Sequence, residues 1–279
     1  MFFREDLFSD VKMTYEGSLV HAETSAFQDL KIYDTARFGK VLVLDGVVQT
    51  TQKDEFIYHE MLTHPFMLSH PKPEAALVIG AGDGGVLREL LKYRSLKKVV
   101  LVEIDGAVID VAKKHLRSIC QDAFSDKRVE LLIEDGAKYV RQTQQLFDLV
   151  IVDSTDPVGP AQVLFSRAFY ADIYRILRKD GIMVRQTGSS FLQPLEIRDS
   201  FRILTDVFSE VLPMVAAIPT YVGGFFNFLV SAKGRTPLDV AFPTLNKRYD
   251  ALRLQTKYYN PEMHFACFAL PNYIKEVLE

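Results

Sequence analysis

The spacing of hydrophobic positions divides the chain into two parts. Residues 1–53 lack long helical periodicity and contain short apolar-rich runs separated by turns at Gly17, Gly39 and Gly46. Runs of this kind, bounded by glycine, are typical of β-hairpins. The runs are GSLVHAET, FQDLKIYDT, KVLVLDG and VVQTT. The pattern predicts a small N-terminal β domain over residues 1–53.

From residue 75 onward, continuous apolar runs alternate with segments of helical spacing. Continuous Val, Ile and Leu runs predict strands that are buried on both faces of a parallel sheet. The predicted strands are 75–80, 98–104, 129–134, 148–153 and 181–186, with a late strand at 226–232, and the helices include 86–93, 107–116 and a segment around 195–209. Residues 54–279 are therefore expected to form an α/β domain with a Rossmann-like, doubly wound sheet.

Composition and charge narrow the class of protein. The 279 residues are 48% hydrophobic and 25% charged, with a net charge of −3 and no long basic run. This balance argues against a nucleic-acid partner, and no apolar run is long enough for a membrane helix. The N-terminal MFFREDLFSD does not look like a secretory signal, and Cys120 and Cys267 form no motif. We expect a cytoplasmic protein without disulfides.

Acidic residues follow each of the first four predicted strands of the α/β domain. They are Asp83, the pair Glu103 and Asp105, the pair Glu134 and Asp135, and the pair Asp153 and Asp156. The carboxyl ends of parallel strands form one edge, where ligands bind. A single acid there is most simply a helix cap, but four sets on one edge should repel and raise each other's pKa values. We therefore expect a cationic or hydroxyl-rich ligand.

The glycine-rich loop GAGDGG at 80–85 predicts a nucleotide site when it is combined with Glu103. Such a loop lets a ligand approach the backbone, and an acid about 20 residues further on can bind ribose hydroxyls. Asp83 lies inside the loop and would repel a pyrophosphate, which argues against a dinucleotide. It would also repel the carboxylate of S-adenosylmethionine. A nucleoside sulfonium without that carboxylate fits Asp83, Asp153 and Asp156 best.

His59 and His64 resemble part of a zinc-protease pattern, but they are five residues apart. On a helix this spacing does not place two side chains on one face. The sequence therefore predicts no metal site here.

Several segments together resemble the polyamine aminopropyltransferases, in particular spermidine synthases of the bacterial type. The resemblance covers nearly the whole chain, in family order. The segments are YHEML (58–62), GAGDGG (80–85), VEID (102–105), EDGAKYV (134–140), DSTDPVGPA (153–161), LFSRAFY (164–170) and PTYVGG (219–224).

The resemblance implies decarboxylated S-adenosylmethionine as co-substrate, putrescine as the usual amine acceptor, and no prosthetic group. It implies a binding site for this co-substrate formed by Gln28, Gly80, Gly82, Asp83, Glu103, Asp135, Gly136 and Pro160, of which Gln28, Glu103, Asp135, Gly136 and Pro160 line its thioadenosine part. It implies an amine site formed by Tyr58, His59, Asp83, Asp153, Ser154, Thr155, Asp156 and Tyr221. Tyr58 and Tyr221 would flank the reacting nitrogen, and Asp153 would accept its proton.

The sequence alone leaves alternatives open. Taken singly, Gln28 could be a surface residue, Tyr58 and Tyr221 ordinary half-buried tyrosines, and Asp135 a helix cap. The acceptor could be agmatine, cadaverine or spermidine, and the fold would also suit a methyltransferase or a silent polyamine-binding protein. Ala81 replaces a glycine of the family loop, and 186–193 are expected in a gate over the site. A homodimer or homotetramer is expected.

Overall fold

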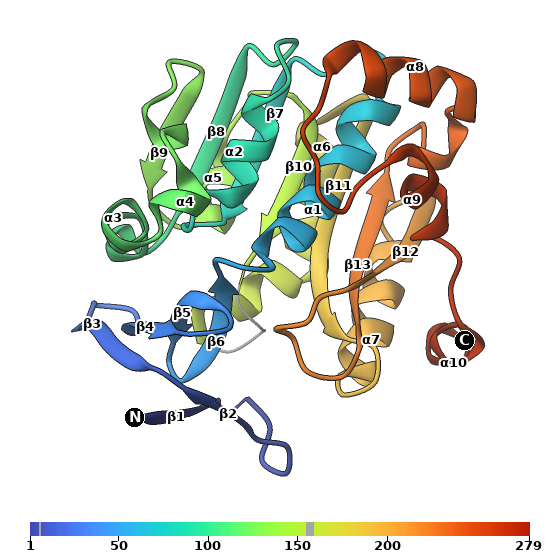
Figure 1. The fold of residues 1–279 in the computed structure, drawn as a ribbon. Coiled ribbons are helices and arrows are strands. Elements are labelled where there is room, and N and C mark those ends of the chain that lie inside the picture. The colour runs from blue at the N-terminus through green and yellow to red at the C-terminus, as the bar shows by residue number, and fades with distance from the viewer. Residues whose placement is uncertain (6, 155–158) are drawn as a thin grey trace.

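The computed structural model describes residues 1–5, 7–154 and 159–279, with only the backbone described at 159–161. The N-terminal part forms two small antiparallel sheets (Figure 1). One is a pair of strands, β1 (Phe2–Glu5) and β2 (Met13–Glu16). The other contains β3 (Ser18–Thr24), β4 (Asp29–Thr35), β5 (Gly39–Leu44) and β6 (Val47–Thr51). The four hairpin strands predicted from the sequence are confirmed, whereas β1 and β2 were not foreseen.

The second part is a seven-stranded sheet in the order β12-β13-β11-β10-β7-β8-β9. Its strands are β7 (Ala75–Gly80), β8 (Lys98–Glu103), β9 (Val129–Ile133), β10 (Phe147–Asp153), β11 (Leu177–Ser189), β12 (Glu210–Ala217) and β13 (Phe225–Ala232). Strands β7 to β11 are parallel, as predicted, but β13 and β12 run antiparallel at one edge. The edge position of β12 lets it contain Pro213, which cannot donate to a neighbouring strand.

Helices cover both faces of this sheet (Figure 1). They are α1 (Glu55–Ser69), α2 (Gly85–Leu91), α3 (Gly106–His115), α4 (Arg117–Cys120), α5 (Gly136–Gln142), α6 (Arg167–Ile176), α7 (Pro194–Thr205), α8 (Phe242–Leu252), α9 (Pro261–Ala266) and α10 (Asn272–Leu278). Short 3-10 helices are η1 (Ala123–Ser125), η2 (Gly159–Phe165) and η3 (Pro237–Asp239).

Alternate residues of β7 show how the two faces are divided. Ala76 and Val78 belong to the hydrophobic core with α1 and α2, whereas Leu77 and Ile79 belong to the core with α5, α6 and α7. Because both faces are buried, the strand is apolar throughout, which made it recognisable in the sequence.

The four-stranded sheet is also covered on both sides. Leu30 and Leu42 pack against α3 and α4, and on the other side Tyr33 and Val41 pack with Phe3 of the N-terminal hairpin. This packing holds the four-stranded sheet against the α/β part. The carboxyl ends of the central strands therefore face the small sheets. The domain boundary after residue 53 stays a prediction.

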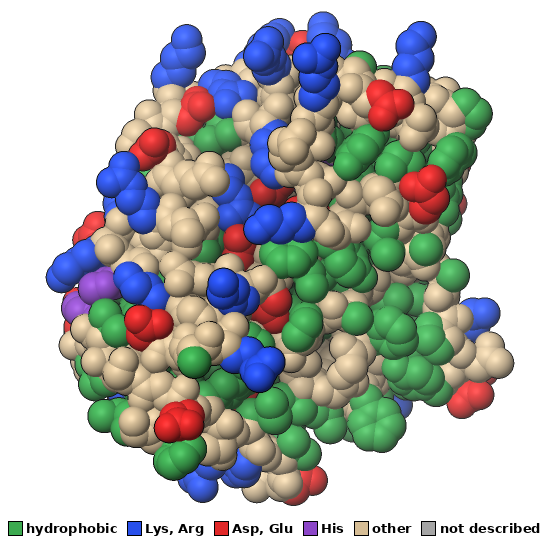
Figure 2. Space-filling view, viewed as in Figure 1, with side chains coloured by type: hydrophobic (Ala, Val, Ile, Leu, Met, Phe, Trp, Pro, Cys, Tyr) green, Lys and Arg blue, Asp and Glu red, His purple; other side chains and the backbone are tan. Residues whose placement is uncertain are grey.

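Surface charge is unevenly distributed. In Figure 2 many Lys and Arg side chains crowd the upper rim, away from the small sheets, and hydrophobic side chains collect on the right. Cys120 and Cys267 are buried free thiols. In the described part of the chain, no helix is both long and apolar enough to traverse a bilayer.

Candidate active site

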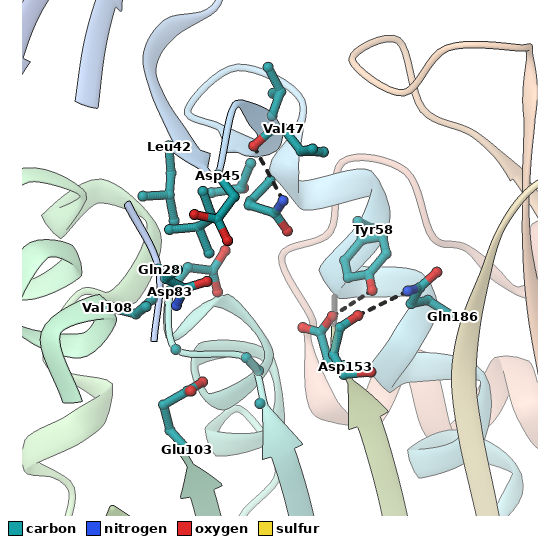
Figure 3. A pocket seen from close by; sticks show the side chains of 18 of the residues that line it. Gln28, Leu42, Asp45, Val47, Tyr58, Asp83, Glu103, Val108, Asp153 and Gln186 are labelled. Carbon is teal, nitrogen blue, oxygen red and sulfur yellow. Dashed lines mark hydrogen bonds between the residues drawn. The ribbon is translucent and has the colours of Figure 1, made fainter. Parts of the chain in front are cut away.

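A cavity of about 690 Å³ lies between the small four-stranded sheet and the carboxyl ends of the central strands. Twelve of the predicted site residues line it: Gln28, Tyr58, His59, Gly80, Gly82, Asp83, Glu103, Asp135, Gly136, Asp153, Ser154 and Tyr221. Of the other predicted residues, Thr155 and Asp156 lie outside the described residues, and only the backbone of Pro160 is described, in η2. In Figure 3, Glu103 and Val108 lie on one side of the cavity, and Tyr58, Asp153 and Gln186 lie on the other.

The glycine loop brings the backbone of β7 against that of β10. The Ala81 N–H donates to the Asp153 carbonyl over 3.0 Å, and Gly80 has a φ of +79°. A Cβ at position 80 would stand 2.0 Å from the Asp153 carbonyl oxygen, so glycine is required there. Ala81 also has a positive φ, +58°, a conformation that costs a non-glycine residue about 1 kcal/mol. The loop adopts this conformation although Ala81 stands where the family loop commonly has glycine.

Glu103 ends β8 on the first side of the cavity. Its Oε1 accepts a hydrogen bond of 2.9 Å from the Asp105 backbone N–H, and its other oxygen faces Gly82. Burial, with smaller contributions from the charges of Asp105 and Asp153, raises the pKa of Glu103 to about 7 against the opposing backbone bonds. Near pH 7 the carboxyl group is therefore about half ionised, and hydroxyl donors would favour its ionised form.

Asp105 links the two parts of the chain. Its carboxylate accepts hydrogen bonds from Gln28 Nε2 at 2.8 Å, Ser25 Oγ at 2.7 Å and the Ala107 backbone at 3.1 Å. It caps α3 and holds Gln28 at the cavity wall. Asp105 therefore holds the site together and does not line the cavity.

Asp135 shows that a helix cap and a cavity position are compatible. Its Oδ1 accepts from the backbone N–H of Ala137 at 2.8 Å and of Lys138 at 3.3 Å, which caps α5. Asp135 and Gly136 also line the cavity. The simple capping interpretation is thus correct in geometry, and a ligand role for this residue stays a prediction.

Asp153 ends β10 on the second side of the cavity. Its Oδ1 accepts a hydrogen bond of 2.6 Å from the Tyr58 hydroxyl (Figure 3). Burial, followed by the charge of Asp83, raises the pKa of Asp153 to about 6, although Tyr58 and His59 oppose this shift. A carboxylate with a raised pKa is a better base than an ordinary one.

Asp83 behaves in the opposite way. Its Oδ1 accepts from the Gly85 N–H at 2.9 Å, and its Oδ2 lies 3.2 Å from His59 Nε2. Burial alone would raise the pKa of Asp83, but the cationic His59 and these bonds outweigh it and lower the pKa below its usual value. The expectation that the converging acids raise each other's pKa is confirmed for Glu103 and Asp153 and is wrong for Asp83, because His59 lies beside it.

Aromatic rings surround the Asp153 side. The ring of Tyr221 lies 5.8 Å from that of Tyr58 and 4.6 Å from that of Phe226. The Tyr221 hydroxyl donates to the Gln49 carbonyl at 2.6 Å, so the ring is fixed and its proton is already used. Aromatic faces beside carboxylates attract ammonium groups.

The sequence pattern does not identify every residue of the cavity. Glu5, Gln49 and Phe226 line the cavity but come from separate strands that only the tertiary fold brings together. Nothing in their local sequence distinguishes them. Within 186–193, Gln186, Ser189 and Gln193 line the cavity, and Gln186 Nε2 donates to the Ser154 carbonyl at 2.9 Å.

The two sides of the cavity are suited to two different chemical groups. The first side offers Glu103 and backbone groups to hydroxyls. The second offers an anionic Asp83, a basic Asp153 and aromatic faces, which suit amines in both the cationic and the neutral state. The arrangement can hold a cation and accept a proton from it.

Family comparisons match almost the whole chain. Residues 55–239 match the spermine/spermidine synthase domain, and residues 3–52 match the spermidine synthase tetramerisation domain. A polyamine aminopropyltransferase of Caldicellulosiruptor saccharolyticus is 42% identical, covering 100% of this chain and 98% of its own. Polyamine aminopropyltransferase 1 of Pseudomonas aeruginosa is 42% identical over 94% of this chain and 91% of its own.

Solved structures agree with these matches. A spermidine synthase in complex with the transition-state analogue AdoDATO has a TM-score of 0.95 and 36% identity, covering 100% of this chain and 94% of its own. The spermidine synthase of Thermotoga maritima has a TM-score of 0.93 with the same identity and coverage.

Proposed function

The chain belongs to the spermine/spermidine synthase family and is a polyamine aminopropyltransferase, and we propose that its amine acceptor is putrescine. Its co-substrate is decarboxylated S-adenosylmethionine, in agreement with the neighbouring structure that contains AdoDATO. The products of the proposed reaction are spermidine and methylthioadenosine.

The reaction is a direct displacement. The neutral amine nitrogen attacks the aminopropyl carbon next to the sulfonium, a new C–N bond forms, and the C–S bond breaks. The sulfur leaves as a neutral thioether, so it needs no acid. The nitrogen becomes cationic and loses one proton to a base. An alkylammonium has a pKa of about 10.4, so binding must also favour the neutral amine.

Asp153 is the proton acceptor in this proposal. The observation that carries it is the position of Asp153 at the end of β10, with a pKa raised to about 6 and Tyr58 bonded to one oxygen. The Tyr58 bond orients the carboxylate and leaves its other oxygen for the amine. Tyr221 and Tyr58 flank the nitrogen, and Ser154, Thr155 and Asp156 follow along the chain.

The thioadenosine part binds on the Glu103 side. Glu103 accepts hydrogen bonds from the ribose hydroxyls, and Gln28, held by Asp105, closes that end. Asp135 and Gly136 at the start of α5, the loop residues Gly80 and Gly82, and Pro160 complete the proposed site. The aminopropyl tail then reaches Asp83, whose lowered pKa keeps it anionic for the ammonium.

Incubation with a panel of amines tests the acceptor. Putrescine, cadaverine, agmatine and spermidine are supplied separately with decarboxylated S-adenosylmethionine, and the amine products are identified by mass spectrometry. We expect the highest kcat/KM with putrescine. A higher kcat/KM with another amine would change the assigned substrate and leave the reaction class intact. Release of no methylthioadenosine with any amine would contradict catalysis.

The protein is an oligomer, as its match to a tetramerisation domain supports. We propose a homotetramer rather than a homodimer, with β3 in the interface because Leu19 and Val20 on it are exposed. Light scattering after size-exclusion chromatography measures the mass. The free thiols of Cys120 and Cys267 fit the proposed cytoplasmic location.

A further inference from the structure

A chain of buried charged side chains leads away from the cavity through the interface between α1 and α2. Acidic and basic members alternate, and successive members lie 2.6 to 3.2 Å apart. No member exposes more than 11% of its side chain. In order from the cavity they are Asp83, His59, Glu55, Arg88, Glu89 and His64. His59 and His64, whose spacing does not match a zinc motif, are thus members of one charge network.

His59 joins this network to the cavity. Its Nδ1 lies 2.6 Å from Glu55 Oε2, and its Nε2 lies 3.2 Å from Asp83 Oδ2. Ionised carboxylates only accept hydrogen bonds, so both ring nitrogens must carry hydrogen and the ring must be an imidazolium. The space for the ring exists because residue 85 is glycine; a Cβ there would stand 2.2 Å from the His59 ring.

The groups around His59 support this charge state. Glu55 on α1 and Asp83 after β7 contact the two ring nitrogens. The ring of Tyr58 packs edge-on against the His59 ring at 5.6 Å, and Asp153 on β10 interacts electrostatically with His59. The only cation of α2 near the ring, within the described residues, is Arg88, which forms two bonds of 2.8 and 2.9 Å to Glu55.

Two opposing effects act on the ring itself. Burial lowers the pKa of His59, but the charges and bonds of Asp83 and Glu55 outweigh it and raise the pKa to about 10. The cation is thus stable over the neutral range. Glu55 and Asp83 contact the imidazolium from opposite sides. Two hydrogen bonds from Arg88 hold Glu55 in place.

We propose that Glu55 is a positioning residue for aminopropyl transfer, since it holds His59 as an imidazolium that orients Asp83 and keeps it anionic for the ammonium of the cofactor tail. This inference rests on the proposed function for its substrate. His59 is then unable to accept a proton or a hydrogen bond from an amine. The proton of the attacking nitrogen is left to Asp153.

The chain offers a matched control for Glu55. Glu89 is another buried carboxylate that contacts Arg88 and one histidine of α1. Its histidine is His64, with Glu89 Oε2 2.8 Å from His64 Nε2. Glu55→Gln and Glu89→Gln therefore remove the same charge from the same network. Only Glu55→Gln removes a contact of His59.

Nitrogen-15 solid-state NMR of histidine-labelled, ligand-free protein measures the charge of the ring, with His59→Gln identifying the signals. In the wild type at pH 8, we expect both His59 nitrogens to be protonated. In Glu55→Gln we expect one of them to lose its proton, and in Glu89→Gln we expect no change at His59. A neutral His59 in the wild type, or an imidazolium that persists in Glu55→Gln at pH 8, overturns the proposal.

Binding assays measure the consequence for the cofactor. Affinity for decarboxylated S-adenosylmethionine should fall about tenfold in Glu55→Gln, because no imidazolium then orients Asp83 and keeps it anionic. Affinity for methylthioadenosine, which lacks the ammonium, should stay within about twofold. Glu89→Gln should change neither by more than about twofold. Equal losses of both ligands, or equal losses in both variants, indicate a structural role only and contradict the positioning role.

The two measurements separate this inference from the proposed function. If the wild type transfers no aminopropyl group, the function fails, while the NMR signals of the ligand-free protein still report on Glu55 and His59. If transfer occurs and His59 is neutral, the function stands and the inference fails. Should Glu55→Gln not fold, a neutral His59 in the wild-type spectrum still overturns the inference.

Discussion

The two sides of the cavity use the same side-chain type in different ways. On the side proposed for thioadenosine, the carboxylates of Glu103 and Asp135 accept hydrogen bonds from backbone N–H groups of their own loops. On the amine side, Asp153 and Asp83 contact side chains of α1. Backbone bonds oppose the rise in the pKa of Glu103 without preventing it, whereas the positive charge of His59 helps to lower the pKa of Asp83. Helix α1 therefore distinguishes the half of the acidic edge proposed for the amines from the half proposed for the ribose.

Asp153→Asn should cause the largest loss of turnover, and it should leave binding in the other half of the cavity nearly unchanged. The amide keeps the size of the side chain but cannot take the proton, so we expect turnover to fall by about 10²-fold or more. Methylthioadenosine affinity should change by less than about twofold, since that ligand is proposed to bind in the other half. Steady-state kinetics and calorimetry measure the two quantities, and near-normal turnover would remove Asp153 from the mechanism.

Glu103→Gln tests the opposite half. The amide loses charge-assisted bonds to the ribose hydroxyls, so methylthioadenosine affinity should fall about 10- to 100-fold. Asp110→Asn, an exposed acid on α3, is the control for the loss of one negative charge. Calorimetry and a circular dichroism spectrum establish affinity and fold. An unchanged affinity in Glu103→Gln would be inconsistent with the assigned thioadenosine site.

Asp83→Asn should reduce the distinction between two cofactors. Asp83 attracts the ammonium of decarboxylated S-adenosylmethionine and repels the carboxylate of the intact form. The preference for the decarboxylated form should therefore narrow by roughly tenfold in the variant. Competitive binding of both cofactors to the wild type and the variant measures it. A preference that survives unchanged would show that another group discriminates.

The pKa of Glu103 gives the smallest expected effect. A pKa of about 7 means that Glu103 is ionised at pH 8 and becomes largely protonated below pH 7. If the ionised form binds the ribose, methylthioadenosine affinity should fall about fourfold between pH 8 and pH 6.5, and this dependence should be absent in Glu103→Gln. A pH-independent affinity in the wild type would contradict the link between the charge of Glu103 and ribose binding.

The sequence predicted the strands well because most of them are buried on both faces. Strand β7 was recognised at its observed bounds from six apolar or glycine residues in a row. Helix α1 was not assigned, because it is buried on nearly all sides and carries Glu55, His59 and His64 among its apolar residues, so no apolar stripe appears. The sequence pattern does not predict strand β12, because Pro213 interrupts its apolar run. Its antiparallel direction depends on the connection to β13 and not on the local sequence.

The sequence predicts those cavity residues that stand at the ends of strands or in the loops after them. Asp83, Glu103 and Asp153 could be found because the ends of parallel strands share an edge. Whether an acid is already engaged, as Asp105 is with Gln28, depends on a partner 77 residues away. The role inferred for Glu55 depends on the packing of α1 against α2. Local sequence contains no signal of either contact.

Cofactor selection by the wild-type protein tests the central claim most directly. We expect the half of the cavity around Asp83 to select a cofactor without a carboxylate. The protein is mixed with putrescine and equal amounts of either decarboxylated or intact S-adenosylmethionine, and affinities and products are measured. We predict binding at least about tenfold tighter for the decarboxylated form, with spermidine and methylthioadenosine formed in equal amounts. Equal affinity for both cofactors, or S-adenosylhomocysteine formed from the intact one, would contradict the account.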